Sequence, residues 1–264
     1  MVERDEVTSS VELSAASLSF DPLQRTKVVE SLVMRGERRL YYRFRAARYY
    51  GGIVTADTLG CCFLCAFCWN FERNLDPTRF KDFFRPDEAA RRLLDIAKRK
   101  SLNLFRISGA EPILGEKSLD HLVEVLRLIF QEKPDAAFVI ESNGFYLGLH
   151  PDLIEKLQFE NLWIRIGLKG IDKESFSKIT GAEEKNFRYP LSALSALEEL
   201  EIKYRPALMG ELFPYKDVSR FELSLQRLGI RAPLELESLE NYPFVQKNMR
   251  ERNLHQFMRK TSDS

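Results

Sequence analysis

All four cysteines of the chain fall between Cys61 and Cys68. Cys61, Cys65 and Cys68 form a C-x3-C-x2-C spacing, which allows one short loop to direct three thiolates toward a single point. Thiolates are soft ligands that select iron–sulfur clusters, zinc or copper(I) over hard ions. A structural zinc site closes its tetrahedron with four protein ligands, and no fourth ligand is obvious here. A cubane cluster held by three cysteines instead leaves one iron open for an exchangeable ligand, so the spacing favours such a cluster.

Cys62 interrupts this spacing, and we expect it to be a packed bystander thiol. The competing hypothesis is a zinc-binding or redox module, whose fourth ligand would have to be Cys62 or a histidine. His121 lies in an amphipathic helical pattern, His150 precedes a proline, and His255 lies in a basic segment. A lone histidine is more often structural or solvated than catalytic. Iron and sulfide analysis distinguishes the two classes of site.

The cysteine spacing, followed by Trp69 and Asn70, resembles the signature of the radical S-adenosylmethionine (radical SAM) enzymes. The resemblance implies a [4Fe–4S] cluster on Cys61, Cys65 and Cys68, with the open iron chelated by the amino and carboxylate groups of SAM. It also implies reductive cleavage of SAM to methionine and a 5′-deoxyadenosyl radical, which abstracts hydrogen from a substrate. In such enzymes the cofactor carries the chemistry, and the protein supplies position and exclusion.

Two further segments extend the resemblance. Phe67 occupies the place of a family aromatic residue that packs near the SAM adenine. The segment 108–112, Ser-Gly-Ala-Glu-Pro, resembles the Gly-Gly-Glu-Pro motif, which implies that Gly109, Ala110 and Glu111 meet the aminium of SAM. Backbone acceptors and a carboxylate suit an ammonium group, and glycine lets the main chain approach closely. Ala110 replaces the second glycine, which matters only if that position needs a positive φ.

Within the family, the chain is most similar to the enzymes that activate glycyl-radical enzymes. The segment 141–144, Glu-Ser-Asn-Gly, resembles their Asp/Glu-Thr-Asn-Gly segment, which implies that Ser142 lies near SAM; Asn-Gly is also a turn signal in any protein. Lys169 matches the lysine of their Asp-x-Lys pattern and would neutralise the SAM carboxylate. Gly167 replaces the aspartate, so the side chain that contacts the SAM ribose in those activating enzymes is missing here.

The elements that must position these residues begin near Gly51, where short apolar runs start to alternate with helical patterns. This alternation indicates βα units and a parallel sheet. We predict strands at 52–56, 102–107, 136–140, 162–168, 202–208 and 234–236. We predict helices at 86–98, 119–130, 152–157, 174–179, 190–200 and 216–228. The resemblance implies an α/β fold in which residues 51–240 form a partial, TIM-like (β/α)6 barrel of the radical SAM type.

Barrels of this kind carry their chemistry at the C-terminal ends of the strands. The cysteine loop and the segments around 108–112, 141–144 and 167–169 each follow a predicted strand, so they should meet at one end. The resemblance also places Arg205 toward the barrel mouth and near SAM, with a surface position as the alternative. Glu235 and Glu237, near the sixth strand, face either inward or outward.

The barrel is flanked by predicted extensions at 1–50 and 241–264. Residues 1–20 are polar and serine-rich, which suggests a loose arm or an edge element. The C-terminal extension contains a basic segment, Lys247 to Lys260, that we predict to be helical.

Between Arg35 and Tyr50, six arginines are interleaved with five aromatic residues. Such a stretch suits phosphates and stacked bases, or an acidic partner. The alternative is a β-hairpin or edge element whose tyrosines pack on the barrel while the arginines face water. We favour this structural interpretation because the overall charge is balanced.

The composition is that of an ordinary globular protein: 264 residues, 44% hydrophobic and 30% charged, with a net charge of +1. The net charge gives no global reason for binding nucleic acid or membrane, and no apolar run approaches the roughly 18 residues that span a bilayer. The acidic start lacks a secretory apolar region, and clustered thiols fit a reducing cytosol. We therefore predict a cytoplasmic protein.

The chain has no further cysteines for a second cysteine-ligated cluster and no room for a separate cobalamin domain. We therefore predict a minimal, activase-like radical SAM enzyme acting on an unidentified protein, RNA or small molecule. It would be a monomer and would receive electrons from a donor such as flavodoxin or ferredoxin. Trp69 and the arginine- and tyrosine-rich stretch suggest the alternative of wyosine-type tRNA modification, although those enzymes usually carry additional cysteines.

Overall fold

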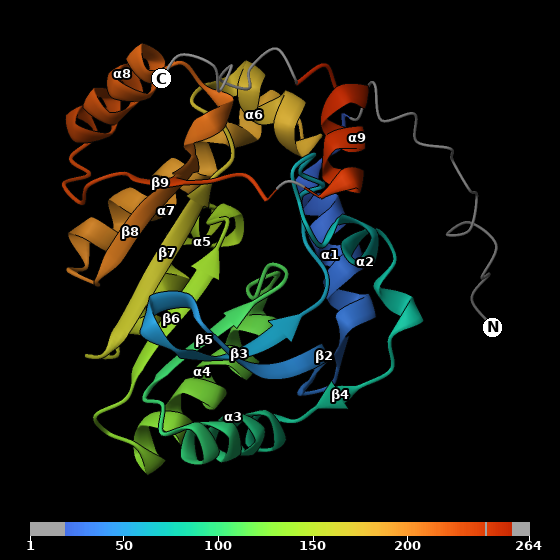
Figure 1. The fold of residues 1–264 in the computed structure, drawn as a ribbon. Coiled ribbons are helices and arrows are strands. Elements are labelled where there is room, and N and C mark those ends of the chain that lie inside the picture. The colour runs from blue at the N-terminus through green and yellow to red at the C-terminus, as the bar shows by residue number, and fades with distance from the viewer. Residues whose placement is uncertain (1–18, 241, 255–264) are drawn as a thin grey trace.

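One curved sheet organises the part of the chain described by this computed structural model, residues 19–240 and 242–254. Six strands pair in parallel and in chain order, and the helices lie outside them (Figure 1). These strands are β3 Ile53–Thr58, β5 Leu104–Ser108, β6 Ala137–Ser142, β7 Leu162–Leu168, β8 Tyr204–Met209 and β9 Glu235–Glu237. Because β9 stands at one end of the strand order and a hairpin at the other, the barrel is partial, as predicted.

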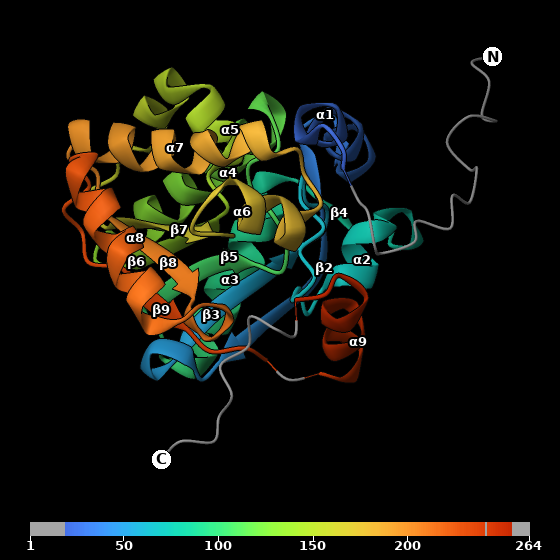
Figure 2. The ribbon, with the colours of Figure 1, turned by 90° about the horizontal axis from the view of Figure 1, so that it is seen from above.

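Helices connect the parallel strands and cover the outer face of the sheet (Figure 2). In chain order they are α3 Pro86–Lys100, α4 Glu116–Glu132, α5 Phe145–Leu149, α6 Lys173–Thr180, α7 Arg188–Glu199 and α8 Tyr215–Arg227, with 3-10 turns at Pro151–Leu157, Glu184–Phe187 and Gly210–Leu212. Helix α4 buries Leu122, Leu126 and Ile129, the apolar stripe expected of a core-facing helix. The predicted strands and long helices are confirmed to within about three residues, although the predicted helix at 152–157 is a 3-10 turn.

The N-terminal segment supplies a helix that the sequence did not predict and a β-hairpin that it did. Helix α1, Pro22–Val33, begins with a proline, and the Asp21 side chain accepts a hydrogen bond from Leu23 N. Two short strands, β1 Met34–Arg35 and β4 Phe83–Phe84, pair with the long strand β2 Arg38–Ala47. Strand β2 runs antiparallel to β3 and therefore extends the sheet beyond the parallel barrel.

The expectation that the arginines of this stretch face water is wrong for Arg39, whereas the side chains of Arg43 and Arg45 keep 45% and 24% of their surface exposed. Arg39 is only 1% exposed and donates to backbone carbonyls. Arg43 Nε and Arg45 Nε lie 2.7 and 2.8 Å from the carboxylate of Asp57, which is itself buried on β3. The physical reason is that hydrogen-bond acceptors lie opposite β2: the Asp57 carboxylate on β3 and the Leu59 carbonyl in the loop that follows. The sequence alone does not show that these acceptors face β2.

The tyrosines of the same stretch divide into two groups. Tyr41 is buried, as expected, and its hydroxyl lies 2.9 Å from His121 Nε2. Burial lowers the pKa of His121 to about 4, so this histidine is a neutral structural residue. Tyr49 and Tyr50 instead remain 54% exposed, in a turn at Tyr49–Gly51.

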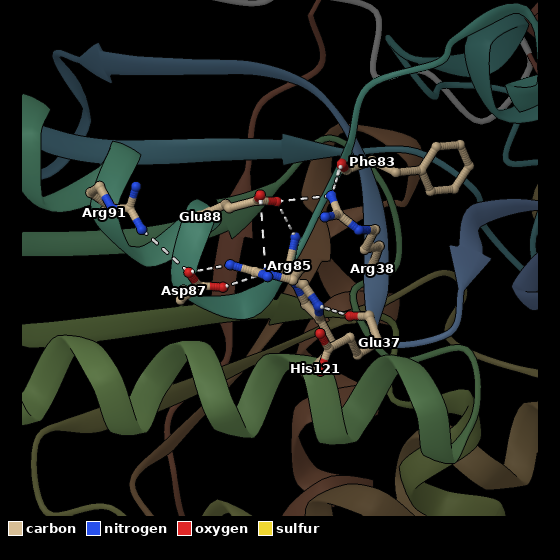
Figure 3. Close-up of polar contacts among 8 residues, drawn as sticks. All are labelled: Glu37, Arg38, Phe83, Arg85, Asp87, Glu88, Arg91 and His121. Carbon is tan, nitrogen blue, oxygen red and sulfur yellow. Dashed lines mark hydrogen bonds and ion pairs between the residues drawn. The ribbon is translucent and has the colours of Figure 1, made fainter.

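A polar cluster fastens the start of β2 to the neighbouring helices (Figure 3). Arg38 Nη1 donates to Phe83 O at 3.2 Å and to Glu88 Oε2 at 3.0 Å. Glu88 also accepts from Arg85 N at 2.8 Å, which caps the N-terminus of α3. His121 Nδ1 lies 2.7 Å from the carbonyl oxygen that precedes Arg38. These contacts bind β2 to both α3 and α4.

The C-terminal helix α9, Pro243–Glu251, begins before the predicted segment at 247–260 and ends within it. Pro243 opens the helix, and the buried Val245 and Met249 anchor it, so apolar contacts rather than basic composition set its start. Both views place α9 on the same side of the molecule as α1 and α2, Phe71–Leu75 (Figures 1 and 2). The predictions for residues 1–18 and for His255 lie outside the described residues.

No helix in the described ranges combines the length and the apolar character that a membrane span requires.

Candidate active site

The cysteine loop, residues 59–70, connects the C-terminal end of β3 to α2. Ala66 N donates to Ile179 O at 2.9 Å, which ties the loop to the last turn of α6. Cys68 N donates to Cys65 O at 3.0 Å and closes a tight turn between the second and third predicted ligands. Backbone contacts therefore hold the loop around the second and third cysteines.

Cys61, Cys65 and Cys68 all line one cavity of about 520 Å³. Cys62 is not among the described residues that line it; this thiol is 1% exposed, and its sulfur accepts a hydrogen bond from Asn143 Nδ2 at 3.1 Å. The structure thus separates the three cysteines that line the cavity from Cys62, whose sulfur contacts Asn143. Within the described ranges no three His, Cys, Asp or Glu side chains are already arranged around a metal position, so coordination itself stays a prediction.

The cysteine thiols differ in acidity. A hydrogen bond with Cys62 lowers the pKa of Cys61 to about 6, although burial acts in the opposite direction. Burial raises the pKa of Cys65 to about 12 and that of Cys68 to about 11. A bound metal favours the thiolate form, so binding at this loop would release protons.

Gly109 lies where β5 ends, and its backbone has a φ of +89°. A Cβ at this position would lie 2.9 Å from Thr58 O, so a side chain is excluded by both conformation and space. The Gly109 carbonyl accepts a hydrogen bond from Asn70 Nδ2 at 2.6 Å, which joins the segment to the cysteine loop. Ala110 has a negative φ, and its replacement of the family glycine therefore introduces no backbone strain.

Glu111 is 3% exposed and accepts three hydrogen bonds. Their donors are Ser142 Oγ at 2.8 Å, Asn143 N at 2.7 Å and Ile113 N at 3.1 Å. Burial, and then the charge of Cys61, raise the pKa of Glu111 to about 8, although these hydrogen bonds act in the opposite direction. Glu111 thus joins the loops that follow β5 and β6, and its charged form is costly until a cation approaches.

Lys169 lies just beyond the end of β7, with its ammonium nitrogen 5.5 Å from the centre of the Phe67 ring. A Cβ on Gly167 would lie 2.6 Å from this nitrogen. The absence of a side chain at Gly167 therefore leaves the space that Lys169 occupies.

The cavity brings together six of the seven residues predicted to bind the cofactor: Phe67, Gly109, Ala110, Glu111, Ser142 and Lys169. Arg205 is absent from the described lining residues. It is the second residue of β8 and pairs in register with Arg165 of β7. Its predicted place near SAM stays a prediction.

The remaining cavity wall is built largely from ion pairs that the sequence did not predict. Arg106 Nη1 lies 2.9 Å from Glu141 Oε1, between β5 and β6. Arg165 reaches both carboxylates of β9, at 2.9 Å from Glu235 and 2.9 Å from Glu237, so both glutamates face inward. The first pair joins the neighbouring strands β5 and β6, and the others join β7 to β9, on the far side of β8.

Aromatic residues also reach the cavity. Tyr49, Tyr50 and Trp69 line it, and the Arg106 guanidinium lies 4.8 Å from the centre of the Tyr49 ring.

The sequence did contain one indication of the ion pairs in the cavity wall. Charged residues stand at inward positions within strands that are otherwise apolar. That signal was too weak to use without the strand register.

The fold defines a class, the partial parallel barrels, and comparison with known proteins identifies the family. The model of the radical SAM superfamily matches residues 56–218. The chain therefore belongs to the radical SAM superfamily, whose members are enzymes that use a [4Fe–4S] cluster and SAM.

Two solved structures of Streptococcus suis SuiB are similar in fold. The first is 15% identical with a TM-score of 0.53, covering 71% of this chain and 40% of that chain. The second, bound to S-adenosylmethionine, is 14% identical with a TM-score of 0.54, covering 75% of this chain and 45% of that chain. The chain thus spans less than half the length of these structures. No curated protein matches its sequence.

Proposed function

We propose that the cavity binds a [4Fe–4S] cluster through Cys61, Cys65 and Cys68, with SAM beside it. When bound, this pair supplies a 5′-deoxyadenosyl radical by reductive cleavage of SAM, and the radical takes hydrogen from a substrate. One observation carries the proposal: the three cysteines open onto the same cavity as Glu111 and Lys169. A soft donor set of three thiolates suits an iron–sulfur cluster.

The residues predicted to bind SAM each carry a group that suits one part of the SAM molecule. Glu111, with the backbone at Gly109 and Ala110, would hold the aminium of SAM. Its carboxylate offers about four lone-pair positions and accepts three hydrogen bonds here, so capacity for a cation remains. Lys169 would neutralise the SAM carboxylate, and Phe67 would pack near the adenine.

Ser142 is held beside this site through Glu111. Its hydroxyl donates to Glu111 Oε1 and accepts from Gly144 N at 3.0 Å. Ser142 would therefore lie near SAM without a free proton to donate, and its contribution would be to orient the carboxylate that meets the aminium.

For the substrate we propose an activase-like reaction, in which hydrogen is taken from a C–H bond that lies next to a polar or charged group of a protein partner. The support is the charged wall formed by Arg106, Glu141 and Arg165 with its two glutamates, which suits a polar group better than an apolar one. The electron donor would be a flavodoxin or ferredoxin, and the enzyme would act as a monomer in the cytoplasm.

A second candidate is modification of RNA, of the wyosine type. It is favoured by the half-exposed Tyr49 and Tyr50, which share the cavity with Trp69. Aromatic faces stack bases at about 1–3 kcal/mol per base. Against it, Arg43 and Arg45 are already engaged by Asp57, which reduces the cationic surface available for phosphates.

The test of the radical SAM assignment is made on anaerobically purified protein. Iron, sulfide and zinc are measured, and the reduced protein is assayed for 5′-deoxyadenosine formed from SAM. We expect four irons and four sulfides per chain and slow formation of 5′-deoxyadenosine without added substrate.

The cysteine variants provide the control for this test. Changing Cys61, Cys65 or Cys68 to Ala should abolish cluster binding, whereas Cys62→Ala should retain it. Stoichiometric zinc, or cluster loss in Cys62→Ala with retention in Cys68→Ala, would contradict the proposal. To separate the two substrate classes, binding of tRNA is measured at low and moderate salt, because phosphate contacts weaken steeply with salt.

A further inference from the structure

Three arginines surround the cysteine loop, and none of them comes from the six parallel strands. Arg25 lies on α1, Arg39 on β2, and Arg252 directly after α9. Arg39 is 1% exposed and Arg252 is 7% exposed. Among the described residues, none of the three forms an ion pair with a carboxylate. Buried cations without a counter-charge are costly, so their positions require an explanation.

Arg25 contacts the loop at the first predicted ligand. Its Nε donates to Cys61 O at 3.1 Å, and its Nη2 donates to Asn74 O at 2.9 Å. The amide of Asn74 in turn lies 3.8 Å from the sulfur of Cys68. Arg25 therefore places a positive charge beside the first ligand and orients a residue that contacts the third.

Arg39 joins the cysteine loop to the segment proposed to hold SAM. Its Nη2 donates to Leu59 O at 3.0 Å and to Glu111 O at 2.9 Å. Its Nε and Nη1 have no hydrogen-bond partner among the described residues. Burial lowers the pKa of Arg39 to about 10, which leaves the side chain protonated at neutral pH.

Arg252 reaches the other side of the loop. Its Nη1 donates to Ile179 O at 2.8 Å, the same carbonyl that accepts Ala66 N. Its Nε and Nη2 are buried without a hydrogen-bond partner in the described part of the chain. The charge of Cys65 favours its protonated form, although burial lowers its pKa.

We propose that Arg25, Arg39 and Arg252 are positioning residues that balance the charge of the cluster and raise its reduction potential. The inference rests on the proposed function. A [4Fe–4S] cluster on three thiolates is an anion, and one-electron reduction makes it more negative. Nearby positive charge therefore stabilises the reduced form more than the oxidised form, and net charge is one of the factors that set cluster potentials.

The experiment is a redox titration of the cluster-loaded, full-length protein without SAM, followed by electron paramagnetic resonance. Each arginine is changed to Met, which keeps most of its volume, and separately to Lys, which keeps its charge. In each Met variant we expect the ratio of oxidised to reduced cluster at a fixed potential to rise about tenfold. For a one-electron couple this is a midpoint lower by about 59 mV. The Lys variants should stay close to the parent.

Arg38→Met is the matched control, because Arg38 adjoins Arg39 on β2 but pairs with Glu88 away from the loop (Figure 3). Its midpoint should equal that of the parent. Cluster-loaded Met variants with the parent's midpoint would overturn the proposal, as would equal shifts in the Lys and Met variants. If Arg39→Met does not hold a cluster, Arg25→Met and Arg39→Lys decide the question. A parent protein without iron and sulfide would instead refute the proposed function itself.

Discussion

At the scale of single residues, Lys169 offers the cleanest test of the SAM site. Its ammonium lies in the cavity beside Phe67 and forms no ion pair or hydrogen bond with the described residues. Lys169→Met should weaken SAM binding by about tenfold or more, since a charge-assisted contact contributes roughly 1.5–3 kcal/mol. The measurement is anaerobic equilibrium binding of SAM to the cluster-loaded protein.

Lys156→Met serves as the control, because Lys156 pairs with Asp120 on the surface. Unchanged SAM affinity in Lys169→Met would show that the lysine does not meet the SAM carboxylate. Glu111→Gln is the companion variant, but a change in its SAM affinity is harder to interpret. Glu111 also holds Ser142 and Asn143 in place, so its loss would combine a binding effect with a structural one.

The sequence predicted those site residues whose type and spacing are themselves the signal. The three cysteines, Glu111 and Lys169 belong to short motifs at strand ends, and the structure brings them to one cavity. Arg39 was not predictable, because its buried position depends on carbonyls at Leu59 and Glu111 that are distant in sequence. A stretch rich in arginine does not indicate which of its side chains is buried in the protein interior.

At the scale of elements, β2 and β3 are joined by a buried ionic contact. Arg43 and Arg45 both pair with the Asp57 carboxylate, whose side chain is fully buried. Arg43→Ala and Arg45→Ala each remove one of these pairings. Each single change should reduce the free energy of unfolding by about 1–3 kcal/mol. The double change leaves a buried carboxylate unpaired and should cost about 3–5 kcal/mol.

Urea unfolding of the single and double variants measures these changes, with the slope of the transition monitored to confirm two-state behaviour. Arg48→Ala is the control, since Arg48 is exposed beyond the end of β2. A double variant as stable as the parent would show that the Asp57 pairings contribute nothing to the attachment of β2.

Elements with strong periodicity were predictable, and short ones were not. The stripe of Leu122, Leu126 and Ile129 identified α4, and the apolar run of β7 gave its bounds directly. Helices α2 and α5 have five residues each, too few to show a helical period. Helix α1 was missed because its apolar face is narrow, although Asp21 and Pro22 provided a start signal.

At the scale of the whole molecule, the C-terminal segment completes the cysteine loop. Val245, Met249 and Leu254 are buried, and Arg252 donates to Ile179 O. A chain ending at residue 240 should therefore melt at a lower temperature and lose iron to a chelator faster than the full chain. Burying one large apolar side chain contributes about 1.5–3 kcal/mol, so the loss should be readily measurable.

A chain ending at residue 254 is the matched control, because it keeps every contact named for this segment. It should resemble the full chain in melting temperature and in the rate of iron release. If the chain ending at residue 240 also resembled it, the segment would be dispensable for holding the cluster.

Arg25, Arg39 and Arg252 all lie outside residues 56–218, the span that matches the superfamily. Mutations in the terminal segments would therefore change the electron affinity of the cluster, while the residues proposed to bind SAM at the strand ends stay unchanged. An ancestral barrel with a fixed reaction could in this way adapt to reductants of different strength. Swapping the terminal segments between relatives would transfer the redox behaviour and leave the chemistry in place.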